Sequence, residues 1–267
     1  MADKVDLLYA CKLPPAKAVE YFRSKGYAIT WNWQEMWQDA HAQAFTVAKV
    51  TRMDILQDIR NAIDEAVSAG VTFEKFKKQL EPKLREKGWW GKRLIAGPDG
   101  VEKTVQLGSP YRLRTIYDTN TQTAYQAGRY KAQVDNRQAR PYGEYVSVMD
   151  SRTSLRCREL NGKIFALGDP LWDGLYPPNH WGCRARVRTR SRQEISGENL
   201  TVESSEGLLG TAQVPIGKTG ETAMVMTYRD PASGNMISPD AGWSYNPGKA
   251  KWKPDLQKYD ADIRNLF

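Results

Sequence analysis

The residues best suited to chemistry in this 267-residue chain lie between Asp150 and Arg192. Two of the three cysteines, Cys157 and Cys183, and one of the two histidines, His180, fall in this stretch. Their spacing, C-x22-H-x2-C, contains the H-x2-C pair of short zinc loops, in which a tight turn brings both side chains inward. The sequence therefore presents three candidate metal ligands, one fewer than a closed structural zinc site requires.

Several arrangements of this cluster are open on sequence alone. Asp150 could supply a fourth oxygen ligand, as could Asp169, Asp173 or water, and the cofactor would then be one zinc ion. The same residues could instead pack as free thiols beside a hydrogen-bonded histidine, or the two cysteines could form a disulfide in an oxidising setting. We expect no catalytic role, because no glycine-flanked nucleophile elbow precedes Cys157 and the chain has no Walker-type phosphate loop.

A basic segment follows the cluster, with an arginine at every second position: Arg184, Arg186, Arg188, Arg190 and Arg192. Residues two apart share one face of a β-strand, so a strand over 184–192 would align these cations in a ridge. Aligned cations repel one another, so the ridge must face solvent or anions. The candidate anions are DNA phosphates, an acidic surface of a partner protein, or the chain's own Glu194, Glu198, Glu203 and Glu206.

Composition sets outer limits on the function. The hydrophobic fraction of 40% and the charged fraction of 26% are typical of a globular protein. The net charge of +8 permits a polyanionic partner without requiring one. No apolar run approaches the roughly 20 residues that span a bilayer, and the first residues lack the pattern of a signal peptide. We therefore expect a protein that is made and used in the cytoplasm and has no membrane partner.

Hydrophobic spacing predicts the elements that position these residues. Three- and four-residue steps predict helices over 16–25, 31–47, 51–70, 72–84 and 110–128. Thr51, Thr72 and Ser109 are the expected caps, and Pro82 is expected to kink or shorten its helix. Alternation predicts strands over 143–149, 163–167 and 184–192, and a hairpin around a turn at 97–100.

Helices that come first and short strands that come later favour an α+β fold. We predict a helical N-terminal region with a flap over 1–107, a small loop-rich β core with a zinc-knuckle-like loop over 108–192, and an extended tail or docking arm over 193–267. The tail contains a predicted strand pair over 214–228 and a short helix near 256–267. Its aromatic residues, Trp243, Tyr245 and Trp252, could anchor it to its own domain or to a partner.

Short motifs follow one another in order over roughly residues 50–190. They are G-W-W-G, V-Q-L-G-S-P-x-R-L-R-T-I-Y-D-T-N, A-Y-x-A-G-R, D-S-R-T, L-N-G-K-I-F, D-P-L-W, Y-P-P-N-H-W and C-R. Together they resemble the phage Mu F-like minor head protein, or head-morphogenesis, family of tailed bacteriophages. Many relatives have cysteines where this chain has Ser154 and Ala185, so the comparison excludes a site with four thiolates here.

The resemblance implies a minor capsid component of the virion head, present in the host cytoplasm during assembly. It implies a role in head assembly, DNA packaging or DNA delivery, carried out by binding and not by catalysis. The implied partners are the portal protein and the major capsid protein, with packaged phage DNA as a further candidate. Two other classes remain as alternatives, a sequence-independent DNA-binding protein outside a virion and a cysteine-dependent hydrolase.

Overall fold

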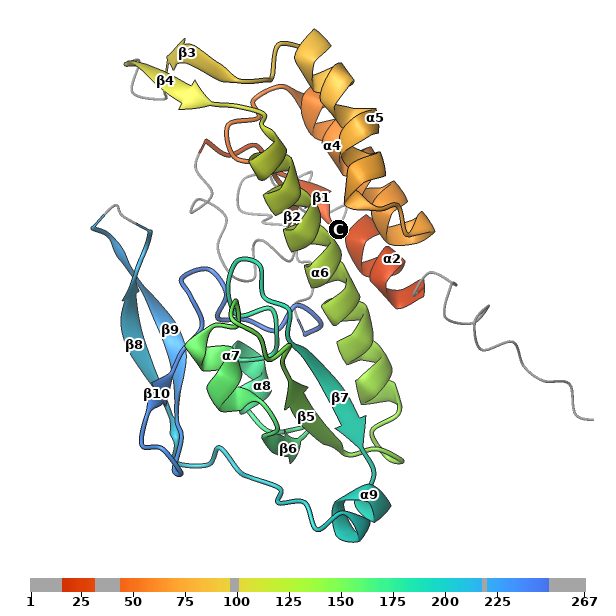
Figure 1. Ribbon diagram of the computed structural model, residues 1–267, viewed down its shortest axis with the longest axis vertical. Coiled ribbons are helices and arrows are strands. Elements are labelled where there is room, and N and C mark those ends of the chain that lie inside the picture. Colours follow the sequence, from red (N-terminus) through yellow and green to blue (C-terminus); the bar gives the residue numbers. More distant parts are fainter. Residues whose placement is uncertain (1–15, 32–43, 97–100, 218–219, 250–267) are drawn as a thin grey trace, which may run out of the picture.

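The structure, a computed structural model, describes residues 16–31, 44–96, 101–217 and 220–249. Helices and strands both contribute to it, which confirms the predicted α+β class. The long helix α6 (Pro110–Asp135) forms the axis of the molecule (Figure 1). Other helices pack along one side of α6 and a small sheet lies along the other, so both halves of the chain depend on this helix.

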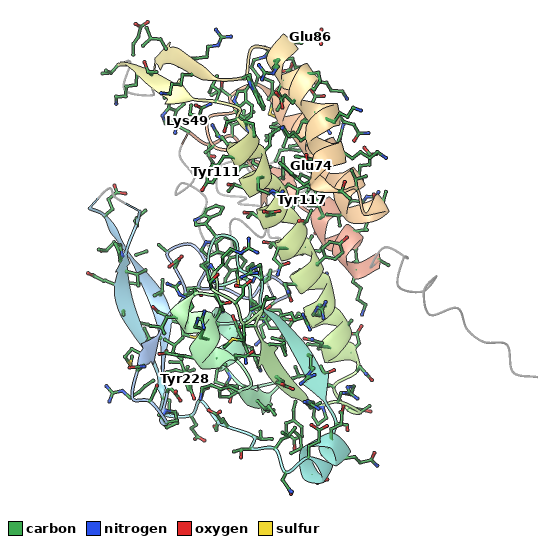
Figure 2. The ribbon with its side chains drawn as sticks, in the orientation of Figure 1. Lys49, Glu74, Glu86, Tyr111, Tyr117 and Tyr228 are labelled. Atoms are coloured by element: carbon green, nitrogen blue, oxygen red, sulfur yellow. The ribbon has the colours of Figure 1, made fainter. Side chains whose placement is uncertain are left out.

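Three helices cover the first side of α6, namely α2 (Ala16–Arg23), α4 (Met53–Ala69) and α5 (Phe73–Glu86). Their apolar residues recur at helical spacing and are buried against α6, as the sequence predicts. Gly70 ends α4 with a φ of 64°, a left-handed conformation that glycine adopts without strain. Tyr117 on α6 lies on the side that faces α5 (Figure 2), where its ring centroid is 5.2 Å from that of Phe76.

Two details of the helix prediction are wrong. The N-cap residue of α4 is Arg52 and not Thr51. Thr72 does occupy the predicted N-cap position of α5, but neither Arg52 nor Thr72 makes a side-chain capping bond. Pro82 does not shorten α5, which continues to Glu86, whereas the kink that was the other expected effect stays a prediction. Proline removes one backbone hydrogen bond, and the buried stripe of α5 against the rest of the helical half outweighs that loss.

The helix predicted over 31–47 is also partly wrong. Ala44–Phe45 form strand β2, which pairs in parallel with β1 (Gly26–Tyr27). Residues 32–43 lie outside the described residues. Helical spacing of aromatic residues cannot distinguish a helix from buried extended chain over a short segment, and here Phe45 packs edge-on against Phe22 of α2.

The predicted start of α6 and the predicted hairpin are confirmed. The Ser109 side chain accepts a hydrogen bond from the Arg112 amide at 3.1 Å, and Pro110 occupies the first helical position. Strands β3 (Lys92–Ala96) and β4 (Glu102–Gln106) pair antiparallel over their whole length. The turn between them, at 97–100, lies outside the described residues.

A three-stranded antiparallel sheet carries the candidate site. Its central strand is β5 (Tyr142–Val146), and its two neighbours are β6 (Ile164–Ala166) and β7 (Arg186–Arg190). Side chains of α6 and of the turn after it donate hydrogen bonds to backbone carbonyls on the outer edge of β7. Gln126 donates to the carbonyl of Ala185 at 3.0 Å and Gln133 to that of Val187 at 2.8 Å, while Arg140 donates to that of Thr189 at 2.7 Å. These groups take the place of a fourth strand.

The tail forms a second sheet that packs on the core. Its strands are β8 (Leu209–Pro215), β9 (Thr222–Arg229) and β10 (Met236–Ile237), in the order β10-β9-β8. The predicted strand pair is thus confirmed, although its first strand begins at Leu209, before the predicted start at 214. Trp243 and Tyr245 are buried within the chain's own fold. Trp252 and the helix predicted near 256–267 lie outside the described residues. The domain boundaries proposed at 107 and 192 stay predictions.

No helix in the described part of the chain combines the length and apolar character needed to cross a membrane. Two buried clusters form the core instead. One joins α2, α4 and α5 to the first part of α6, and the other joins the end of α6 to the sheet β6-β5-β7 and to Tyr228 of the tail. The second cluster surrounds the candidate site.

Candidate functional site

The structure brings the three candidate ligands together. Cys157 lies in α7 (Leu155–Leu160), and His180 and Cys183 lie in the loop before β7. The Cys157 sulfur is 3.3 Å from His180 Nε2 and 3.9 Å from the Cys183 sulfur. All three ligand atoms lie within 4.8 Å of one another, and both thiols are free and buried.

Local sequence explains why these atoms meet. Ser154 caps α7 through the amide of Cys157, which fixes the cysteine in the first turn of that helix. The amide of Cys183 donates to the carbonyl of His180 at 3.2 Å, closing a tight turn. Gly182 in this turn has a φ of 69°, where a side chain would be strained. The H-x2-C pair therefore faces α7 because of the turn, as its spacing predicts.

Backbone and side-chain groups around the cluster orient its ligands. His180 Nδ1 lies 2.9 Å from the carbonyl oxygen of Trp181. A carbonyl can only accept, so Nδ1 carries a proton and Nε2 is the nitrogen directed at the sulfur. The Tyr145 hydroxyl lies 3.4 Å from the Cys157 sulfur and accepts a hydrogen bond from the side-chain amide of Asn179 at 2.9 Å. No local sequence pattern marks Tyr145 or Asn179, because each joins the cluster only through tertiary packing.

Electrostatics distinguish the two thiols. Hydrogen bonding with Cys183 and His180 lowers the pKa of Cys157, against the opposing effect of burial. Hydrogen bonding with Cys157 and burial raise the pKa of Cys183 well above its usual value. Burial lowers the pKa of His180, but its hydrogen bonds to Cys157 and to the Trp181 carbonyl raise it by more. The cluster thus favours ionisation of Cys157 over ionisation of Cys183 and makes His180 a stronger base.

The aspartates proposed as a fourth ligand have other partners. The carboxylate of Asp150 accepts two hydrogen bonds from Arg184, at 2.5 and 2.7 Å, and this pairing lowers its pKa far below the usual range. Asp150 is not a member of the cluster of ligand atoms. The other two candidates are also engaged, Asp169 with the amide of Leu171 at 2.9 Å and Asp173 with Lys249.

The arginine segment is shorter than predicted but keeps its alternation. Strand β7 covers Arg186–Arg190, and Arg192 begins the short helix α9 (Arg192–Gly197). Ser191 ends the strand because its side chain and the carboxylate of Glu194 form a capping box. Ala185 and Val187 are buried on the face opposite the arginines, as the two-residue period requires.

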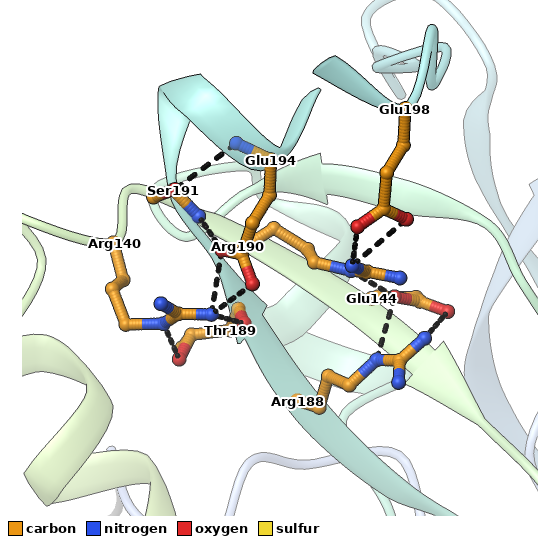
Figure 3. A network of polar contacts seen from close by, with 8 residues as sticks. All are labelled: Arg140, Glu144, Arg188, Thr189, Arg190, Ser191, Glu194 and Glu198. Carbon is orange, nitrogen blue, oxygen red and sulfur yellow. Dashed lines mark hydrogen bonds and ion pairs between the residues drawn. The ribbon is translucent and has the colours of Figure 1, made fainter. Parts of the chain in front are cut away.

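Carboxylates of the same chain bind three of the five arginines. Arg184 binds Asp150, as described above. Arg188 and Arg190 both bind Glu144 of β5, with nitrogen–oxygen distances of 2.7 and 2.6 Å (Figure 3). The Glu144 side chain is 10% exposed and that of Arg190 is 11% exposed, so this pair is largely removed from water. Most of the predicted ridge is therefore an internal network.

The tail glutamates contribute less to this network than predicted. Only Glu198 contacts the ridge, at 3.0 Å from Arg190 (Figure 3). Glu194 binds Arg140 instead, at 2.7 Å, and Glu203 binds Lys163 at 3.1 Å. The main partner, Glu144, was not predicted from the sequence. The only signal for Glu144 was its place beside the buried Tyr145 in an alternating strand, which puts the carboxylate on the outer face.

The fold and the site define an α+β protein. Most arginines of its basic segment bind acidic residues of the same chain, and its two described cysteines lie next to one histidine. Residues 57–188 match the family model described as Phage Mu protein F like protein. The chain belongs to this family. The resemblance inferred from the motifs is thereby confirmed.

Two curated relatives extend this match over most of the chain. The chain is 46% identical over 254 residues to "Putative capsid assembly protein F" of Escherichia phage Mu, a match that covers 94% of this chain and 58% of the relative. It is 42% identical over 231 residues to "Mu-like prophage FluMu F protein" of Haemophilus influenzae, covering 85% of this chain and 55% of the relative. The chain thus spans little more than half the length of either relative. No solved structure matches it.

Proposed function

We propose that this chain takes part in the assembly of a tailed-phage head and acts by binding another head protein. The observation that carries the proposal is the 46% identity, over 94% of the chain, to a relative named as a putative capsid assembly protein. Portal protein and major capsid protein are the candidate partners. The site of action is then the virion head, reached from the host cytoplasm.

The surroundings of Cys157 support binding over catalysis. A nucleophile must reach its substrate, but the Cys157 residue is only 3% exposed. The cavity beside its sulfur, which Ser154 and His180 also line, has a volume of about 10 Å³. That volume is close to the size of one water molecule, so a substrate does not reach the Cys157 sulfur through it. A larger cavity of about 420 Å³ is lined by His180 and Cys183 but not by Cys157.

The internal pairing of the arginines supports a protein partner over DNA. Sequence-independent DNA binding depends on cations that are free to neutralise phosphates. Arg184, Arg188 and Arg190 are held by carboxylates. Arg186 and Arg192 are exposed, and within the described part of the chain no carboxylate pairs with either. Only two of the five arginines in this segment are therefore available to neutralise DNA phosphates, which is a small positive surface for binding DNA.

We expect the double variant Arg186→Ala/Arg192→Ala to bind duplex DNA as weakly as the wild type, at both low and moderate salt. Both side chains are exposed, so the variant should fold normally. Fluorescence anisotropy with a labelled random-sequence duplex measures the affinity and its salt dependence. Tight wild-type binding that weakens in this variant and loses part of its salt slope would contradict the proposal and favour DNA as the partner.

The free edge of the tail sheet is the surface best suited to a protein partner. Strand β8 is an edge strand, and in Figure 1 no element of the described residues lies beside its outer side. Its seven residues, L-G-T-A-Q-V-P, carry no charge. Natural proteins usually protect such an edge with charges, bulges or a covering element. An uncharged extended segment of a head protein could add to this edge as a further strand.

The register shows which backbone groups face outward. The Arg229 amide bonds to Leu208 and the Ile216 amide bonds to Glu221, so even-numbered residues of β8 exchange bonds with β9. The amides of Thr211 and Gln213 therefore point to the open side. A proline at 213 removes an outward N–H group and leaves the ladder to β9 intact.

We expect Gln213→Pro to exclude the chain from phage heads, whereas Gln213→Ala, which keeps the amide, remains incorporated. Quantitative mass spectrometry of purified heads measures the amount of the chain, and equal melting temperatures of the two purified variants show that the fold is intact. Absence of the wild-type chain from heads would contradict the head role itself. Normal incorporation of Gln213→Pro would contradict only the assignment to β8.

A further inference from the structure

Two separations within the cysteine–histidine cluster are close to those between the ligands of one metal ion. In a tetrahedral zinc site, Zn–S bonds of about 2.3 Å and a Zn–N bond of about 2.0 Å place the ligand atoms about 3.5 to 3.8 Å apart. The separations here are 3.9 Å between the two sulfurs and 3.3 Å between the Cys157 sulfur and His180 Nε2. These two separations are close to those of a tetrahedral site, and all three ligand atoms lie within 4.8 Å of one another.

We propose that Cys157, His180 and Cys183 bind one Zn²⁺ ion. Soft thiolate and imidazole ligands select zinc among the common divalent cations. The inference goes beyond the head-assembly role and does not depend on it. The ion would link α7 to the loop that precedes β7, and so join two segments that are 23 residues apart along the chain.

The surroundings of the three ligands support this assignment independently of their distances. Zinc-binding histidines usually donate their second ring N–H to a carbonyl or carboxylate, which fixes the ring orientation. His180 does this through Nδ1 and the Trp181 carbonyl, 2.9 Å away. Backbone amides of Asn179 and Ala185 hydrogen-bond to the Cys183 sulfur, which holds this sulfur in place within the cluster. On metal binding, any protons that the ligand atoms carry would be released to solvent.

Ser154 lies beside the cluster, and we place the fourth corner of the site next to it. Its hydroxyl lies 2.9 Å from His180 Nε2, and the cavity of about 10 Å³ that it lines has room for one water molecule. We assign a water at this corner, held by the Ser154 hydroxyl. Asp150 is excluded from the fourth position because its carboxylate is bound to Arg184.

Metal analysis of the purified full-length chain tests the site. Protein made in zinc-supplemented medium should contain about one zinc per chain, and Cys183→Ser should lose it. Two matched variants should retain it, Cys11→Ser at the third cysteine and Asp150→Asn at the rejected ligand. Replacement of zinc by cobalt should give the intense visible absorption of a tetrahedral thiolate site in the wild type and not in Cys183→Ser.

Further measurements keep the test valid if a ligand variant fails to fold. A strong chelator should lower the melting temperature of the wild type and expose two additional thiols to a thiol reagent. Ser154→Cys, which supplies a fourth thiolate, should lower the zinc Kd by at least about tenfold. Metal-free wild-type protein, or zinc retained by Cys183→Ser, would overturn the site, and an unchanged Kd in Ser154→Cys would overturn the fourth position.

Discussion

Replacing Gly128 with valine is expected to lower the free energy of unfolding by about 3 kcal/mol. Gly128 is buried on α6, where α2 crosses it. A Cβ atom at this position would lie 2.5 Å from the backbone nitrogen of Ala18 and 2.9 Å from its Cα. Backbone atoms cannot rotate away as a side chain can, so α2 must move off α6 and expose part of the first core. Urea denaturation followed by circular dichroism measures the loss.

The matched control is Gly197→Ala at the end of α9, where an added Cβ meets nothing within 4 Å. This change should be neutral or slightly stabilising, because alanine favours helix over glycine by up to about 1 kcal/mol. A Gly128→Val protein as stable as the wild type would contradict the close packing of α2 on α6. Equal losses in both variants would point to a general effect of glycine replacement.

Replacing Glu144 with glutamine is expected to cost about 2 to 3 kcal/mol of stability. The variant keeps the size of the side chain but removes the charge that Arg188 and Arg190 share. Arg190 is largely buried, so its guanidinium would lose its main partner where water cannot replace it. Glu198→Gln is the control, since Glu198 also binds Arg190 but is half exposed. Exposed pairs contribute at most about 1 kcal/mol, so the control should lose much less.

The loss of stability caused by Glu144→Gln should depend on pH in a defined direction. Burial raises the pKa of Glu144, but hydrogen bonds from Arg188 and Arg190 lower it by more, so its pKa in the folded protein is below the usual value. The stabilisation is therefore present above the unfolded pKa of about 4.3 and is lost as the pH falls through the lower folded pKa. The difference between the wild type and Glu144→Gln should be full at neutral pH and shrink in strong acid. A constant difference would contradict the pairing.

Local signals in the sequence predicted the long elements well. Helix α6 was recognisable from Ser109 and Pro110 at its start and from its apolar spacing, because these features act within a few residues of one another. The H-x2-C turn was recognisable for the same reason. Errors arose where one residue decided between two local structures, as at the cap of α4, or where tertiary packing outweighed a local preference, as at Pro82.

Pairings between distant segments could not be predicted from the sequence. The arginine alternation correctly indicated a strand with one charged face, but the identity of the neighbouring strand decides what that face meets. Strand β5 lies about forty residues earlier and places Glu144 directly opposite Arg188. The hydrogen bonds from Gln126 and Gln133 to the edge of β7 were equally unpredictable. The sequence of a helix does not indicate which distant carbonyl a glutamine side chain will bind. The candidate ligands were predicted, whereas the residues that orient them were not.

The most direct test of the proposed head-assembly role is a count of heads in lysates of the phage that encodes this chain. Electron microscopy would compare the wild type with a phage in which this gene is deleted, with and without the full-length protein supplied in trans. We predict few closed, DNA-filled heads after deletion and their return on complementation. Normal numbers of filled, infectious heads in the deletion would contradict the role in head assembly.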